Sequence, residues 1–85
     1  MPTLSQFYGI QIFMNFKDHL PPHFHAEYGE AEALIEIRTG AVNRGGLPPR
    51  ALRMVREWLE LHRAEVAENW ELAQREGPLF RIAPL

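Results

Sequence analysis

Three of the chain's four histidines lie close together, in an arrangement suited to proton transfer or metal binding. They are His19, His23 and His25, within the segment Asp18-His19-Leu20-Pro21-Pro22-His23-Phe24-His25. Histidine is the side chain that most readily exchanges a proton near neutral pH, and it is the commonest ligand for transition metals. The sequence therefore marks these three histidines as candidate catalytic residues.

The alternation of side chains along a strand predicts which of these groups share a face. If the chain is extended after the two prolines, His23, His25 and Glu27 point to one side, because successive strand side chains point to opposite faces. Phe24 and Tyr28 then point to the other side. We expect a strand with one packed apolar face and one face that presents imidazole and carboxylate groups.

Three interpretations of the histidine cluster are open. The imidazoles can divide general acid and base work, as in metal-free cleavage of a phosphodiester. They can instead hold a divalent ion such as Zn²⁺ through His23 and His25, with His19 or another nearby group as the third ligand. They can also be structural and bond the backbone groups that the prolines leave free. Secondary candidates for the site are Asp18, Glu27, Tyr28 and His62.

Length and composition exclude several classes of protein. The chain has 85 residues, which we expect to form one domain over residues 1–85. It has no cysteine, so a disulfide framework and a thiolate zinc site are both excluded. Its net charge of −2 gives no general attraction to nucleic acid, so such binding needs a local basic patch. We expect no signal peptide, no membrane segment and a cytoplasmic location.

The order of the elements predicts an α+β fold. Alternating apolar residues and turn signals predict strands at about 7–15, 23–28, 31–38 and 41–44, which form an antiparallel meander of three to four strands. Two prolines then precede a helix at about 49–75, which Gly77 and Pro78 end. An extended tail follows over residues 78–85. We expect the helix to pack on one face of the sheet.

An apolar stripe runs the length of the predicted helix. Its members are Ala51, Val55, Trp58, Leu59, His62, Val66, Trp70 and Ala73. A helix this long extends beyond a sheet of short strands, so its second half needs the tail or a second copy of the chain as a partner. His62 either bonds a strand carbonyl in the core or joins the other histidines. Phe13 is either exposed or covered by the tail.

Three arginines, Arg50, Arg53 and Arg56, lie in the first two turns of the helix. Basic groups at a helix start oppose the helix dipole, which favours acidic groups there. One interpretation is that these arginines bind phosphate or an acidic partner surface. The other is that they form a solvated face tolerated at small cost.

Motifs spread along the chain resemble one family. They are Met1-Pro2-Thr3-Leu4, Phe7-Tyr8-Gly9-Ile10, the histidine segment, Leu47-Pro48-Pro49-Arg50-Ala51-Leu52, Glu57-Trp58, His62, Asn69-Trp70 and Ile82-Ala83-Pro84-Leu85. Together they resemble the small bacterial domain-of-unknown-function family numbered 4160. The resemblance implies one half of a two-gene, toxin–antitoxin-type module, with a small cognate antitoxin-like protein as partner. It implies no catalytic residues.

These observations lead to two hypotheses about function. The first is a toxin-like component that acts on RNA as a metal-independent ribonuclease, with the histidines moving protons and the arginines holding phosphate. The alternative is a non-enzymatic protein-interaction or metal-binding module in which the histidine cluster is structural. A homo-oligomer formed through the long helix or the tail fits either hypothesis.

Overall fold

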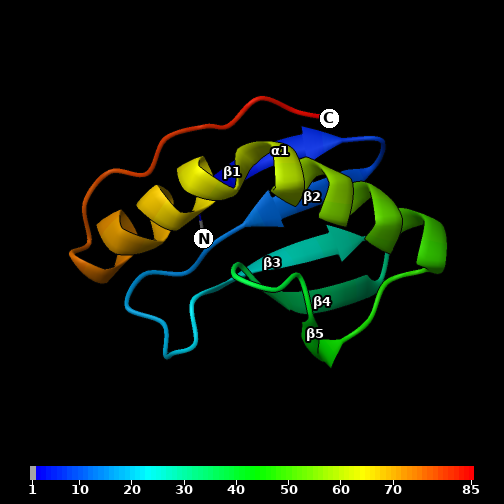
Figure 1. Ribbon diagram of the computed structural model, residues 1–85, viewed down its shortest axis with the longest axis horizontal. Helices are drawn as coiled ribbons and strands as arrows, with labels where there is room; N and C mark the ends of the chain where they lie inside the picture. The colour runs from blue at the N-terminus through cyan, green and yellow to red at the C-terminus, as the bar shows by residue number, and fades with distance from the viewer. Residues whose placement is uncertain (1) are drawn as a thin grey trace.

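The computed structural model describes residues 2–85, in which one long helix lies on one face of an antiparallel sheet (Figure 1). The strands are β1 (Thr3–Phe7), β2 (Ile10–Phe13), β3 (His23–Tyr28), β4 (Ala31–Glu36) and β5 (Val42–Gly45), and the helix is α1 (Pro49–Gln74). Each strand pairs with the next along the chain, in the order β1-β2-β3-β4-β5. The predicted α+β meander followed by one long helix is therefore confirmed.

The first strand differs from the prediction. Instead of one strand over residues 7–15, this region contains β2, and a turn at Tyr8 and Gly9 connects β2 to an additional strand, β1, that precedes the predicted one. Both turn residues have positive φ, 48° and 81°, which is the backbone of a tight hairpin matched to the twist of the sheet. Tyrosine rarely adopts this conformation and is common in strands. The sequence pattern at Tyr8 therefore predicted a strand residue and gave no sign of the turn. The sheet consequently has five strands, rather than three to four, and the other strands lie within two residues of their predicted bounds.

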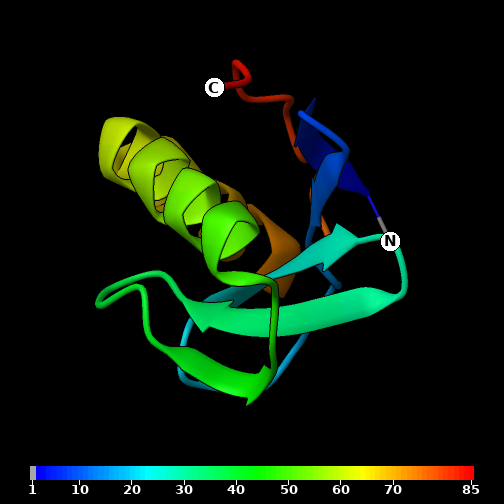
Figure 2. The same cartoon turned by 90° about the vertical axis from the view of Figure 1, so that its right-hand side faces the viewer.

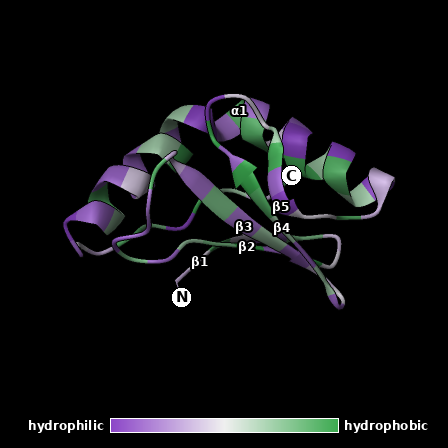
Figure 3. Cartoon of the chain, turned by 90° about the horizontal axis from the view of Figure 1, so that it is seen from below, coloured by the Kyte–Doolittle hydropathy of each residue, from purple (hydrophilic) through white to green (hydrophobic). Residues whose placement is uncertain are grey.

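The helix begins at a proline and buries one stripe against the sheet. Pro49 is the first helical residue, where its fixed φ is compatible with the helix and its missing N–H costs nothing. Trp58 is the centre of the packing, with its ring centroid 5.8 Å from those of both Phe7 and Phe24. The buried helix residues are Ala51, Val55, Trp58, Leu59, Val66, Asn69, Trp70 and Ala73. Figure 3 shows the corresponding alternation of hydrophobic and hydrophilic residues along α1.

The C-terminal tail packs against both the sheet and the helix. It runs back beside β1, where the N–H of Ile82 donates to the carbonyl of Leu4 (Figure 2). The indole Nε1–H of Trp58 donates to the carbonyl of Ala83. The buried side chain of Asn69 bonds both the N–H and the carbonyl of Phe80. The tail is therefore a packing partner of the helix, as the sequence suggested.

Within residues 2–85, α1 falls short of the length of apolar sequence that a bilayer-spanning helix needs.

Candidate functional site

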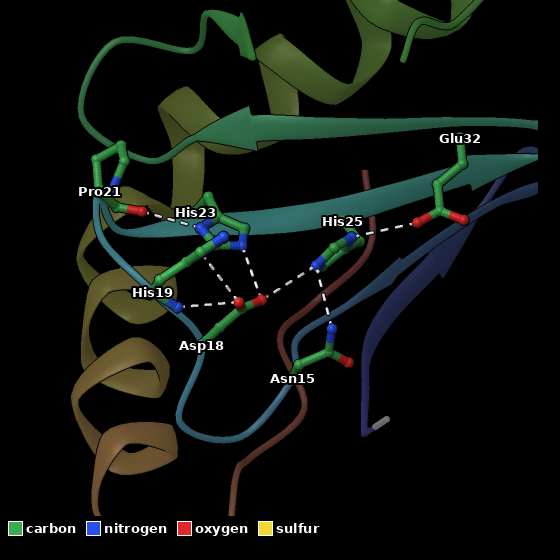
Figure 4. A network of polar contacts seen from close by, with 7 residues as sticks. All are labelled: Asn15, Asp18, His19, Pro21, His23, His25 and Glu32. Atoms are coloured by element: carbon green, nitrogen blue, oxygen red, sulfur yellow. Dashed lines mark hydrogen bonds and ion pairs between the residues drawn. The ribbon is translucent and has the colours of Figure 1, made fainter. Parts of the chain in front are cut away.

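Asp18 is the residue on which the histidines converge. It lies in the connection between β2 and β3, and its carboxylate faces three imidazoles (Figure 4). Its Oδ2 atom lies 2.9 Å from Nε2 of His23 and 3.5 Å from Nε2 of His25. Its Oδ1 atom lies 3.2 Å from Nδ1 of His19. The sequence placed Asp18 among the secondary candidates, whereas the structure puts it at the centre of the cluster.

His23 is buried, with only 1% of its surface exposed. Its Nδ1 lies 2.9 Å from the carbonyl oxygen of Pro21, which can only accept, so Nδ1 carries a proton. Its ring also packs on Trp70 of α1, at 5.3 Å between centroids. The sequence left open whether His23 faces solvent or the helix, and in the structure it is enclosed against the helix. Because β3 begins at His23, this side chain reaches the end of the sheet where the helix and the loop both close over it.

His25 lies on the face of the sheet away from the helix and is held on three sides. Its Nδ1 lies 3.2 Å from Oε2 of Glu32, a carboxylate that can accept a hydrogen bond from Nδ1–H. Its Nε2 lies 3.3 Å from Nδ2 of Asn15, whose amide N–H can donate to it. Its ring stacks on Phe13, with centroids 4.9 Å apart and planes 9° apart. Phe13 is consequently buried beneath His25 and is not an exposed aromatic.

His19 is the accessible member of the cluster, with 77% of its side chain exposed. Its backbone N–H donates to Oδ1 of Asp18 at 2.9 Å, so the loop turns tightly around the carboxylate. Its ring centroid lies 5.8 Å from that of His23. His19 thus flanks the buried part of the site from the solvent side.

The surroundings of Asp18 favour its charged form. Partial burial raises the pKa of the Asp18 carboxyl, but the His19 backbone N–H and the His23 and His25 side chains lower it by more. The net result is a pKa below the ordinary value for an aspartate. The site therefore holds a carboxylate anion at neutral pH.

Asp18, His23 and His25 form a set that can bind a metal ion. One ligand atom from each of them lies within 4.8 Å of the other two. An ion with metal–ligand distances of about 2.0–2.2 Å requires ligand atoms roughly 3–4 Å apart. The Asp18–His23 and Asp18–His25 distances of 2.9 and 3.5 Å are close to that range, so a small rearrangement would admit an ion. The sequence predicted His23 and His25 as ligands, with His19, Asp18, Glu27 or His62 as candidates for the third. Of these candidates the structure favours Asp18.

Three of the predicted secondary site residues lie outside this cluster or at its edge. Glu27 is on the same strand as His25, two residues further on. It is paired with Gln11 on β2 and with Glu32 on β4. Tyr28 ends β3, five residues from His23. The hydrogen-bond partner of His62 among residues 2–85 is Glu65, whose Oε1 lies 2.7 Å from Nδ1, rather than a strand carbonyl or another histidine. The non-helical φ and ψ of His62, −129° and 21°, mark a kink in α1.

The arginines also lie away from the histidines. The cluster contacts α1 at Trp70, twenty residues after Arg50, which corresponds to roughly 30 Å of helix. Arg56 donates from Nε to the carbonyl of Gly40, in the turn between β4 and β5. Arg53 is exposed. The structure thus brings Asp18 and the three histidines together but does not add the arginines to them.

Sequence reasoning missed the groups that orient the histidines, Asn15, Glu32 and the Pro21 carbonyl. A signal for Glu32 was present. His25 pairs with Leu34, so Glu32 is its diagonal neighbour on the same face of the β3–β4 hairpin. The Pro21 carbonyl had no such signal, because its direction depends on the course of the loop.

Comparison with known proteins gives one match. The model of the family described as Domain of unknown function (DUF4160) matches residues 9–71, about three quarters of the chain. No curated protein and no solved structure matches the chain.

Proposed function

The chain belongs to the family described as Domain of unknown function (DUF4160), and from its site we propose that it is a metal-binding module. The ligands are Nε2 of His23, Nε2 of His25 and the Asp18 carboxylate. The ion is a divalent first-row transition metal such as Zn²⁺. With two imidazoles and one carboxylate, this donor set suits such an ion.

One observation carries the proposal. In both His23 and His25, Nδ1 faces an oxygen acceptor while Nε2 faces Oδ2 of Asp18. A neutral histidine whose Nδ1 carries the proton has a lone pair on Nε2. In His23 this lone pair would face a carboxylate oxygen at 2.9 Å, which is unfavourable unless a proton or a metal ion lies between them. In His25 the Asn15 amide can also donate to Nε2, and a metal ion would take its place. Metal-bound histidines commonly donate their other N–H to a carboxylate or a backbone carbonyl, as His25 and His23 do here.

Three protein ligands leave at least one position for water or another ligand, as in zinc sites that perform chemistry. The ion would also fasten the loop after β2 to the start of β3, because Asp18 comes from the loop and both histidines come from the strand. In a non-enzymatic module, the ion would have this structural role.

Calorimetric titration of chelator-treated, dialysed protein with ZnCl₂ and MnCl₂ tests the proposal. We expect one ion per chain, and at least a tenfold weaker affinity in His25→Ala. His62→Ala is the matched control, since it removes an imidazole outside the cluster, and it should bind as the unaltered protein does. The absence of binding, or equal binding by His25→Ala, would refute the proposal.

A second candidate function is the toxin-like action on RNA that the sequence predicts. The observation in its favour is His19, an exposed imidazole whose Nδ1 lies 3.2 Å from the Asp18 carboxylate. A carboxylate that orients a histidine is a common feature of general acid–base sites. A cytoplasmic setting and a small cognate antitoxin-like partner belong to this candidate.

Incubation of the protein with total RNA tests this second candidate. Cleavage that persists in EDTA and is lost in His19→Ala would support metal-independent acid–base chemistry. Cleavage that is absent in every condition, or equal in the unaltered protein and His19→Ala, would refute it.

A further inference from the structure

A cavity lies at the other end of the sheet from the histidine cluster. Its volume is about 570 Å³, and it is lined by the turn after β1, the end of β3, the first turns of α1 and the end of the tail. Tyr28 at its wall is five residues along β3 from His23, or roughly 16 Å. The volume falls within the range of roughly 300–1,000 Å³ typical of small-molecule sites.

Tyr8 contributes an aromatic ring that the fold does not need. The residue has φ 48°, a left-handed conformation that a bulky side chain adopts rarely, and 69% of its surface is exposed. Asparagine, aspartate or glycine would suit this hairpin turn better. Neither turn chemistry nor core packing explains a tyrosine here. Strained residues with exposed side chains are typical of binding sites.

The ring of Tyr28 forms the neighbouring wall. A Cβ atom on Gly9 would lie 3.3 Å from Cε1 of Tyr28, so the ring rests against the glycine backbone. A larger residue at position 9 would displace the ring, and the positive φ of Gly9 also favours glycine. Glycine thus lets Tyr28 lie beside the turn that carries Tyr8, and both rings line one cavity.

Two charged side chains complete the wall. Arg50 and Glu57, both exposed, line the same cavity from α1. A guanidinium binds phosphate oxygens in a bidentate fashion, and a carboxylate accepts hydrogen bonds from an amino group. Aromatic rings, a phosphate-binding group and an acceptor in one cavity match the parts of a nucleotide.

We propose that this cavity binds a nucleotide, whose base stacks on Tyr8 or Tyr28 and whose phosphate contacts Arg50. Base–aromatic stacking is the usual way in which proteins hold an unpaired base. The nucleotide is either a free mononucleotide or one unit of a single-stranded RNA. The proposal does not rest on the metal centre, since the two sites share no residue.

Binding measurements on the full chain in EDTA test the proposal without interference from metal. The probes are AMP, followed by calorimetry, and a labelled five-nucleotide oligoadenylate, followed by fluorescence anisotropy. We expect both probes to bind, with similar affinity if the ligand is a free nucleotide and with tighter oligonucleotide binding if it is RNA. Absence of binding by both probes at millimolar concentration would overturn the proposal.

Matched variants locate the binding. Tyr8→Gly removes the ring while relieving the backbone, so the protein should stay folded by circular dichroism and bind at least tenfold more weakly. Tyr8→Phe keeps the ring and should bind within about threefold of the unaltered protein. Arg50→Gln should weaken binding, whereas Arg53→Gln, outside the cavity lining, should have less effect. If Tyr8→Gly and Arg50→Gln both bind as tightly as the unaltered protein, the nucleotide binds elsewhere and the proposal is overturned.

Discussion

Asp18 and His23 connect a loop to the buried core, with Oδ2 of the aspartate 2.9 Å from Nε2 of the histidine. His23 is buried against Trp70, whereas Asp18 stands in the loop between β2 and β3. The Asp18–His23 pair therefore holds the loop against the sheet and the helix. The strength of this interaction should affect the free energy of unfolding as well as metal binding.

The first prediction concerns the stability of the chelated protein. Asp18→Asn keeps the shape of the side chain but removes the charge that His23, His25 and the His19 N–H contact. A hydrogen bond to a charged group contributes about 1.5–3 kcal/mol, so we expect the free energy of unfolding to fall by about 1–3 kcal/mol. Urea denaturation in EDTA measures it. Glu27→Gln, an isosteric change outside the cluster, should have little effect, and an equal loss in both variants would contradict the prediction.

The second prediction concerns the pH dependence of the same difference. The pKa of Asp18 is lower in the folded chain than in the unfolded chain, so between these values the unfolded state binds more protons. The stabilisation is present above the unfolded pKa, about 3.9, and is lost as the pH falls through the folded value. In EDTA, the stability difference between the unaltered protein and Asp18→Asn should shrink below about pH 4. A difference that grew on acidification would contradict the shift.

The sequence predicted the fold well where local signals agreed. The prolines before α1 and the glycine after it delimit the helix at Pro49–Gln74, within a residue of the predicted bounds. The sequence pattern failed to predict the turn at Tyr8, because tyrosine is typical of strands and rare in left-handed turns. The seven-residue spacing from His62 placed Asn69 on the apolar side of the helix. Periodicity could not show what this polar side chain bonds, because its partner is backbone in the tail.

The candidate site was predicted only in part. Alternation correctly separated His25 from Phe24, because side-chain direction in a strand is a local property. The burial of His23 depends on Trp70, forty-seven residues later, and no local pattern contains it. The central position of Asp18 depends on the path of the loop. The dispersal of the arginines depends on the direction in which the helix crosses the sheet.

The third prediction concerns the attachment of the tail. The amide of Asn69 donates to the Phe80 carbonyl at 3.0 Å and accepts from the Phe80 N–H at 2.9 Å. Asn69→Ala removes both bonds and leaves two backbone groups without partners, so we expect a loss of about 2–3 kcal/mol. Urea denaturation measures the loss, and limited proteolysis should show faster cleavage in the tail. The exposed neighbour Glu68→Ala is the control, and unchanged stability and proteolysis in Asn69→Ala would refute this account of the tail.

The last prediction isolates the group that orients His25. Glu32 is not a proposed ligand, but its Oε2 lies 3.2 Å from Nδ1 of His25. Glu32→Gln keeps the size of the side chain but weakens the hydrogen bond that it accepts from Nδ1–H. The imidazole is then held less firmly, and its Nε2 becomes a weaker metal ligand. Loss of such outer partners costs about 10- to 100-fold in metal affinity. Calorimetric titration with ZnCl₂ should show that loss at unchanged stoichiometry, while Glu27→Gln, its cross-strand neighbour, should not. Equal affinities in the two variants would mean that Glu32 does not tune the metal site.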